Sequence, residues 1–145
     1  MKQEDYVSFE VAKMLKEKGY YEFCNAYYHN DNDKAYKKLT DDERFESCWQ
    51  IESFSNKDNK YRDAAPSLAQ AAKWLREEHN IHVDVGVAGD FSNDADGNVC
   101  EEWTFWVFDI YTIDSLHHFD IEDNREYSSY EEALNEGIKE ALKMI

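Results

Sequence analysis

Long apolar stretches are the first thing this sequence lacks. Its longest continuous apolar run is only a few residues, and the opening residues, Met1 to Asp5, are mainly polar or charged. A membrane-spanning helix needs about 20 apolar residues in a row, and a secretory signal peptide needs an apolar segment of roughly 7–15 residues. We therefore expect neither kind of segment, and we expect the protein to be cytoplasmic.

Positive charge is the second shortage. The chain of 145 residues has 32 acidic and 16 basic side chains, which leaves a formal net charge of −16. Such a strongly negative charge repels the phosphates of nucleic acids and of anionic lipids. Direct binding to nucleic acid or to a membrane is therefore not expected.

Hydrophobic side chains, in contrast, are plentiful enough for a folded core. Hydrophobic residues make up 42% of the chain and aromatic residues 15%, and this excludes a disordered chain in spite of the high charge. The length is within the usual size of one domain. We expect a single α+β domain covering residues 1–145.

Cysteine pairs and catalytic signatures are also missing. Cys24, Cys48 and Cys100 are odd in number, and no Cys-x-x-Cys spacing occurs. This pattern predicts reduced thiols that are buried as small hydrophobic side chains; a Cys24–Cys48 disulfide stays open only for an exported chain. The sequence has no Gly-x-Ser-x-Gly, Gly-x-Gly-x-x-Gly or Gly-x-x-x-x-Gly-Lys-Ser/Thr motif. No catalytic residue and no cofactor is predicted, and an enzyme is not expected.

One acidic loop approaches the pattern of a calcium site without completing it. Ser92, Asp94, Asp96 and Gly97 fall at the first, third, fifth and sixth places of an EF-hand loop. The twelfth place is Trp103, where such a loop needs a bidentate Glu. We interpret these residues as a hairpin turn and predict no metal there.

The histidines do not complete a metal site either. The stretch from His29 to Asp33 offers possible ligands on one loop, but spacing alone specifies no site, and we expect a solvated loop. His117 and His118 are adjacent, so on a strand they point to opposite faces. His79 and His82 flank a predicted helix-to-strand turn. Both pairs are interpreted as structural or surface residues.

The most apolar stretch runs from Trp103 to Tyr111. Its aromatic and β-branched residues predict a β-strand whose two faces are both largely apolar. Such a strand is expected to be buried on both sides, either at the centre of a sheet or at a subunit interface. The candidate interface residues are Trp103, Phe105, Trp106, Phe108 and Asp109.

Asp109 interrupts one of these apolar faces. A buried carboxylate there would need a partner or a shifted pKa. The simpler interpretation is that the strand has reached its exposed end at Asp109.

Periodicity predicts three helices and several further strands. Helices are expected over residues 8–19, 67–80 and 129–145, and strands over residues 23–28, 47–54, 81–87 and 103–111, with a short strand within residues 116–121. The last two long strands should form an antiparallel hairpin. The charged segment 29–46 is a candidate functional or mobile insertion, with a helical turn at residues 34–39. We predict an antiparallel sheet of about four strands, with the second and third helices packed on one face.

Capping residues set the expected helix boundaries. The predicted N-caps are Ser8, Ser67 and Ser129, with capping boxes completed by Gln70 and Glu132, and the predicted C-terminal stops are Gly19 and Asn80. Gly137 lies on the buried stripe of the last helix, where glycine lowers helix propensity. This predicts close approach to a neighbouring backbone, such as the strand that begins at Trp103.

Three blocks of the sequence, residues 6–19, 65–83 and 129–143, resemble a family of small uncharacterised acidic proteins of gut anaerobic bacteria and their prophages and mobile elements. The resemblance covers about half of the chain. It implies a bacterial or phage-related cytoplasmic protein, and it provides no activity or binding residue to transfer.

Three functional hypotheses follow. The first is a non-catalytic interaction module, in which an acidic surface with exposed Tyr and Trp side chains binds a protein partner or a second copy. The second is a DNA-mimic inhibitor, whose carboxylates imitate phosphates and occupy a nucleic-acid-binding protein. The third is a small metal-dependent hydrolase, which requires a deep pocket that gathers His, Asp or Cys side chains.

Overall fold

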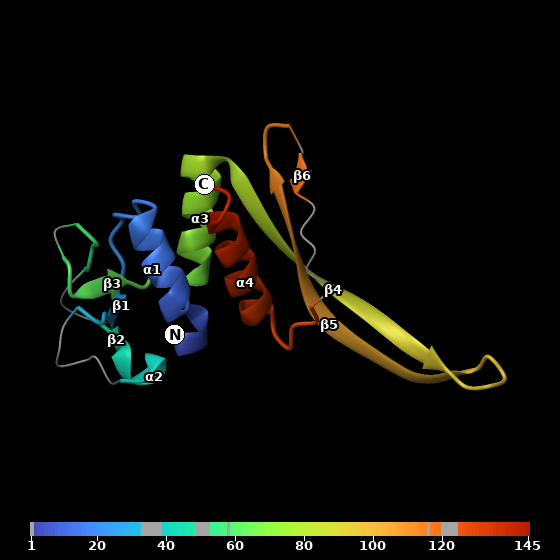
Figure 1. The fold of residues 1–145 in the computed structure, drawn as a ribbon. Coiled ribbons are helices and arrows are strands. Elements are labelled where there is room, and N and C mark those ends of the chain that lie inside the picture. The colour runs from blue at the N-terminus through green and yellow to red at the C-terminus, as the bar shows by residue number, and fades with distance from the viewer. Residues whose placement is uncertain (1, 33–38, 49–52, 58, 116, 120–124) are drawn as a thin grey trace.

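The computed structural model describes residues 2–32, 39–48, 53–57, 59–115, 117–119 and 125–145. The protein is an α+β structure in which two three-stranded antiparallel sheets lie on either side of a group of helices (Figure 1). The prediction of one four-stranded sheet is therefore wrong. Local pattern recognised the strands that begin near Phe23, Ile81 and Trp103, but it missed the strand at residues 62–64 and placed residues 45–46 in a charged segment. Pairing, moreover, joins strands that are distant in sequence, and local pattern carries no information about it.

The first sheet consists of β1 (Ala26–His29), β2 (Phe45–Ser47) and β3 (Arg62–Ala64), in the order β2-β1-β3. All four residues of the central strand β1 are buried. A single turn of helix, α2 (Asp41–Arg44), packs against β1 and β2. A short 3₁₀ helix, η1 (Gln3–Asp5), lies near the N-terminus and packs against the last helix of the chain.

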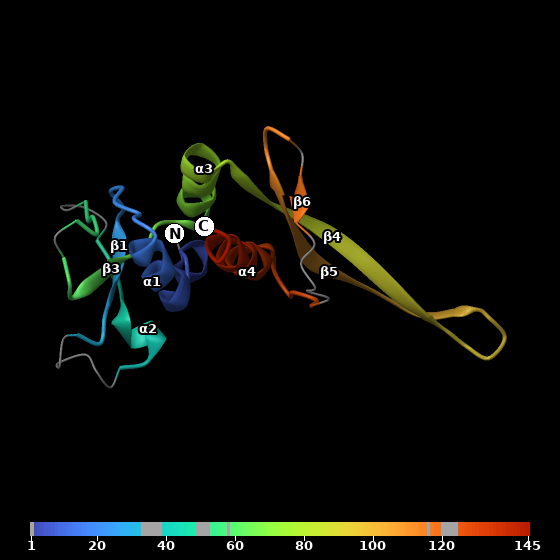
Figure 2. The same cartoon turned by 45° about the horizontal axis from the view of Figure 1, so that its top comes forward.

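Three longer helices lie between the two sheets (Figures 1 and 2). They are α1 (Phe9–Glu17), α3 (Leu68–His79) and α4 (Tyr130–Leu142). Helix α1 packs against β3 and α4, while α3 and α4 pack against each other and against β4 of the second sheet. Their shared core contains the fully buried side chains of Leu15, Leu75, Ile110, Ile138 and Leu142.

The predicted helix ends are largely confirmed. Ser8 and Ser67 are N-caps, and Ser67 forms the capping box with Gln70. Gly19 has a φ of +87°, and the Tyr20 amide donates to the Leu15 carbonyl at 2.9 Å, which is the geometry of a Schellman motif.

The two remaining caps differ in one detail. Asn80 ends α3 in the left-handed conformation, as expected. Ser129 caps α4 by accepting from the Glu132 amide, but the Glu132 carboxylate accepts from Ser128 and not from the cap residue. The predicted capping box is therefore only half formed, because Ser128 offers both an amide and a hydroxyl to the same carboxylate.

The second sheet consists of β4 (Ile81–Asn93), β5 (Val99–Thr112) and β6 (His118–Phe119), with β5 in the centre. The predicted antiparallel hairpin of β4 and β5 is confirmed, and the register pairs Ile81 with Thr112 and Val87 with Trp106. Both strands are longer than expected. They continue beyond the helices, so that the far half of the hairpin projects from the rest of the molecule (Figures 1 and 2).

Two predictions about buried and exposed residues are wrong. His29 and Asn30 are buried instead of lying in a solvated loop, because β1 extends to His29 and Asn30 donates to the Lys60 carbonyl and to Asp63. Of the three cysteines only Cys24 is buried, and Cys100 is exposed since it lies on the projecting half of β5. None of the three cysteines, all of which lie within the described residues, forms a disulfide, and burial raises the pKa of the Cys24 thiol.

Several predictions fall partly outside the described residues. These are the helical turn at residues 34–39, the strand over residues 47–54 and the segment 116–124. Within the described part, Phe54 forms an isolated bridge with Cys24, and β6 occupies residues 118–119. Among the described helices, none is long and apolar enough to cross a membrane.

Candidate interaction surface

The far half of the β4–β5 hairpin is the main candidate for a functional surface. We call residues 87–105 the arm; it contains Val87–Asn93 of β4, the connecting turn, and Val99–Phe105 of β5. Figures 1 and 2 show that the arm extends away from the helices in both views. Its side chains are therefore available to a partner from most directions.

The turn at the tip of the arm has the structure expected from its sequence. The Asp94 carboxylate accepts from the amides of Asp96 and Asn98, each at 2.9 Å, and Gly97 has a φ of +84°. An Asp side chain that bonds to amides further along the chain is a common way to close a turn. These contacts account for the conformation of the acidic loop.

Alternation along β5 defines two faces of the hairpin. The helix face carries Phe108 and Ile110, and it packs against α4: a Cβ atom built on Gly137 of that helix would lie 3.1 Å from the Phe108 ring and 2.4 Å from Val83. The open face carries the alternate residues Trp103, Phe105, Val107, Asp109 and Tyr111. Among the described residues, no helix packs on this open face.

The arm exposes apolar side chains along both of its strands. Val87 is 61% exposed, Phe91 57%, Val99 52% and Trp103 39%. The prediction that the Trp103 strand is buried on both faces is therefore wrong within this chain, since Ile110 is its one residue classed as buried. Large apolar groups that stay in contact with water mark a surface suited to binding another molecule.

The five predicted interface residues are divided between the two faces. Trp103 and Phe105 lie on the open face of the arm, while Phe108 packs on the core and Trp106 contacts the Tyr130 ring at a centroid distance of 5.6 Å. Asp109 is exposed on the open face, with its Oδ1 atom 3.4 Å from Nε2 of His118. It is exposed because that face is open and not because the strand ends, since β5 continues to Thr112.

The stretch that forms the arm and the inner part of the hairpin contains acidic residues and no lysine or arginine of its own. The whole stretch between Arg76 and Arg125 contains no basic residue other than histidine. Within β4, β5 and their turn there are seven acidic residues: Asp84, Asp90, Asp94, Asp96, Glu101, Glu102 and Asp109. This local absence of cations was visible in the sequence, and it would have pointed to the arm if charge had been counted segment by segment.

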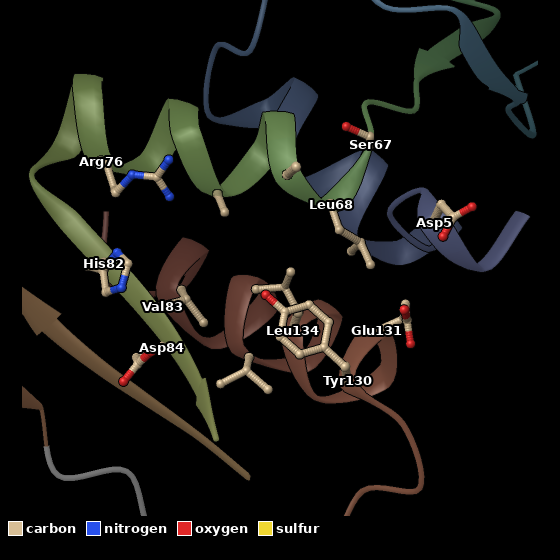
Figure 3. A pocket seen from close by; sticks show the side chains of 13 residues that line it. Asp5, Ser67, Leu68, Arg76, His82, Val83, Asp84, Tyr130, Glu131 and Leu134 are labelled. Atoms are coloured by element: carbon tan, nitrogen blue, oxygen red, sulfur yellow. The ribbon is translucent and has the colours of Figure 1, made fainter. Parts of the chain in front are cut away.

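A groove lies at the root of the hairpin, between α3, β4 and α4 (Figure 3). Its volume is about 540 Å³, and its walls include Leu68, Val83 and Leu134. Arg76 and His82 lie toward one end in this view. The groove thus combines an apolar floor with a few polar groups, and it is the nearest approach to the pocket that a hydrolase would need.

The polar groups of this groove are not arranged for hydrolysis. The Ser67 hydroxyl accepts from the Gln70 amide as a helix cap, and the His82 ring packs against Tyr111 at a centroid distance of 5.1 Å. Among the described residues that line the groove, no nucleophile is therefore seen paired with a base. In the part of the chain that the structure describes, no group of three or more His, Cys, Asp or Glu side chains could hold a metal ion.

A second polar cluster lies on the first sheet. Nε2 of His29 is 2.9 Å from the Glu46 carboxylate, and the Arg62 guanidinium lies over the Tyr27 ring. Hydrogen bonds from Tyr27 and His29 hold the pKa of the Glu46 carboxyl below its usual range, while burial raises the pKa of the Tyr27 hydroxyl. Because these groups satisfy one another, we interpret the cluster as a support for the sheet.

Comparison of the chain with protein-family models, with curated proteins and with solved structures gives no match.

Proposed function

We propose that this protein is a non-catalytic interaction module and that the arm is the element that binds a partner protein. The observation that carries this proposal is the projection of apolar side chains, Val87, Phe91, Val99 and Trp103, on a ribbon that extends away from the helices. Aromatic anchors surrounded by charged groups are typical of the core and rim of a protein interface.

The construction of the arm supports the same conclusion. A two-stranded ribbon without further strands or a covering helix is only marginally stable in water. The sequence nevertheless gives the arm Phe91, Trp103 and Phe105, side chains that gain most from burial. A partner that covers these residues would supply the burial that the arm does not obtain from its own chain.

Site-specific photo-crosslinking in the cells of origin tests the proposal. A photoreactive phenylalanine analogue would replace Phe91 or Val99 on the arm. The matched controls place it at Tyr21 or Phe23, which are 58% and 68% exposed on the body of the protein. We expect discrete protein adducts from the arm positions and none of the same mass from the controls.

Two results would contradict this proposal. One is that neither arm position yields a discrete adduct; the other is that the control positions capture the same proteins equally well. Light scattering over a concentration series, at low and high salt, then identifies the kind of partner. A mass of two chains that persists in high salt would make the partner a second copy.

The cation-free stretch favours a DNA mimic as a second candidate function. An acidic ribbon without lysine or arginine could occupy the basic groove of a nucleic-acid-binding protein. In that case adduct formation should depend on carboxylates more than on aromatic rings. The two candidates are separated by comparing Asp90→Asn/Glu101→Gln/Glu102→Gln with Phe91→Ser/Trp103→Ser: loss in the first variant alone supports a DNA mimic, and loss in the second alone supports aromatic anchoring.

A further inference from the structure

One long edge of the arm has no partner strand. In the order β4-β5-β6, β4 is an edge strand, and among the described residues it pairs with β5 alone. An edge of this kind presents unpaired backbone N–H and C=O groups, which can pair with another extended segment.

The hydrogen bonds of β5 identify which backbone groups of β4 face outward. The amide and carbonyl of Trp106 bond to Tyr127, on the side of β5 away from β4, at 2.9 and 3.0 Å. Because the groups of an antiparallel strand alternate in direction, the pair Val87–Trp106 exchanges no hydrogen bonds across the hairpin. Val87 and, by alternation, Gly89 therefore direct their N–H and C=O groups to the free edge. Phe91 has the same direction, but its amide already donates to Oδ1 of Asp90 at 2.8 Å.

This edge has few of the features that usually protect an exposed strand. Natural edge strands are blocked by lysine, by proline, by bulges or by being short. β4 has 13 residues and contains neither lysine nor proline. Its irregularity in register falls at Ser92 and Asn93, next to the turn, and leaves the pairing from Ile81 to Ser92 regular.

The side chains of β4 beside this edge differ between its two faces: acidic residues lie on one face and apolar residues on the other. On one face of β4 lie Asp84 and Asp90, and on the other lie Val87 and Phe91. A strand placed next to β4 would match both faces if its basic residues alternated with apolar ones. Opposite charges that face each other across two strands, and apolar side chains that do so, both stabilise the pairing.

Gly86 adds an observation of a different kind. A Cβ atom at this position would meet nothing within 4 Å apart from its chain neighbours, so the packing of the described residues does not require glycine there. Across the hairpin, Gly86 is paired with Val107 and Ala88 with Phe105, which leaves small residues on the edge strand beside large ones on β5. A glycine inside a strand often marks close approach of another molecule.

We propose that the free edge of β4, from Gly86 to Phe91, accepts an extended segment of a partner protein in which Lys or Arg alternates with apolar residues. This inference rests on the proposed function and specifies the partner's chemistry. A second copy of this chain fits the edge poorly: between Arg76 and Arg125 it offers carboxylates against carboxylates and no lysine or arginine.

The probe for this proposal is a short synthetic peptide in which Lys and Val alternate, labelled for fluorescence anisotropy. One control peptide has Glu in place of Lys, and another has the same composition with the lysines in one block and the valines in another. The alternating Lys peptide should bind at least about tenfold more tightly than either control, since only this peptide presents cations on one face and apolar groups on the other. Binding should weaken as salt is raised.

Val87→Pro separates strand addition from general attraction to an acidic surface. Proline at this position removes an outward N–H that the hairpin itself does not use, and an edge strand tolerates it. We expect Val87→Pro to weaken peptide binding at least about tenfold, and Val87→Ala to weaken it less than about threefold. In addition, peptide binding should slow hydrogen exchange at the outward amides of Val87 and Gly89.

Charge is tested with two variants of equal net charge. Asp84→Asn/Asp90→Asn should weaken binding several-fold, whereas Glu22→Asn/Glu53→Asn, at exposed positions on the body, should leave it unchanged. Equal binding of the alternating and block peptides, an unaffected Val87→Pro variant, or equal losses in the two charge variants would each overturn the proposal. Because adduct formation at Phe91 and Val99 does not depend on the peptide, such a failure leaves the interaction module itself standing.

Discussion

The two halves of the β4–β5 hairpin have the same strands and one continuous ladder, but only one of them is covered. In the inner half, residues 81–86 and 107–112, Val83 is 6% exposed and packs beside α4. In the arm, Val87 lies four residues further along the same strand and is 61% exposed. An apolar alternating pattern therefore specifies a strand, and it does not specify whether the covering surface belongs to the same chain.

Two glycines differ in the same way in how closely their neighbours approach. Gly137 of α4 lies so close to the inner half that a Cβ atom would meet Val83 at 2.4 Å. Gly86, the last residue of the inner half before the arm, has no other described residue within 4 Å of where its Cβ would lie, its chain neighbours left out. The first glycine is explained by the packing of this chain, and the second is explained if another molecule approaches the edge.

Gly137→Val should destabilise the packing of α4 on the inner half of the hairpin, and its effect should be the largest among these variants. The added side chain would collide with Val83 and Phe108, and overpacking of this kind costs about 3 kcal/mol. Thermal or urea unfolding followed by circular dichroism measures the loss of stability. A variant as stable as the wild type would show that α4 and the hairpin move apart easily, and the contrast between the two halves would then disappear.

Truncating aromatic side chains in the two halves sharpens the comparison. Phe108→Ala removes a ring that packs on the core and should lower the free energy of unfolding by about 2 kcal/mol. Trp103→Ala removes the larger ring from the arm and should change it by less than about 0.5 kcal/mol. The pair is measured by urea unfolding under one set of conditions, and similar losses in both variants would mean that the arm is covered in solution.

Local sequence signals predicted the helices well because each signal acts within one or two turns. Ser8, Ser67 and Ser129 satisfy amides within three residues of themselves, and Gly19 and Asn80 adopt the left-handed conformation that few other residues tolerate. Their effect does not depend on the rest of the fold. Gly137 was also interpreted usefully, although its close neighbours are the side chains of Val83 and Phe108 and not a backbone.

Burial and strand pairing could not be predicted in the same way. The stretch from Trp103 to Tyr111 is apolar on both faces, and burial on both sides was the natural expectation. The helices cover only its inner part on one face, because both strands are longer than the surface that α3 and α4 offer. The division into two sheets depends on contacts between β1, β2 and β3 across long sequence separations, which no local pattern records.

The candidate surface was only partly accessible to sequence reasoning. Trp103 and Phe105 were predicted as interface residues and lie on the open face, but alternation alone could not show that Phe108 would be used by the core. The absence of lysine and arginine between Arg76 and Arg125 was a clearer sign. Overall net charge conceals it, because the 16 basic residues all lie outside this stretch.

Gly86→Val should have the opposite sign to Gly137→Val. Valine favours a strand and restricts the unfolded chain, and the position has room for its side chain, so stability should stay unchanged or rise by up to about 1 kcal/mol. Thermal unfolding of the two variants side by side provides the measurement. A marked destabilisation by Gly86→Val would mean that the space beside this residue is filled in solution by the protein itself.

Apart from its control, Asp84→Asn is expected to have the smallest effect, and it tests the electrostatics of the open face. Asp84 and Asp109 are paired directly across β4 and β5, and like charges at such a pair destabilise a sheet. Removing one of them should raise the free energy of unfolding by about 0.5 kcal/mol at low ionic strength, and the gain should shrink in high salt because both carboxylates are exposed. The control is Asp94→Asn at the tip, which removes the same charge but keeps an Oδ1 acceptor for the two turn amides and should therefore change stability less than Asp84→Asn. A loss of stability in Asp84→Asn would instead indicate that this carboxylate makes a favourable contact within the protein. The acidic residues of the open face would then be explained by folding stability, without a partner.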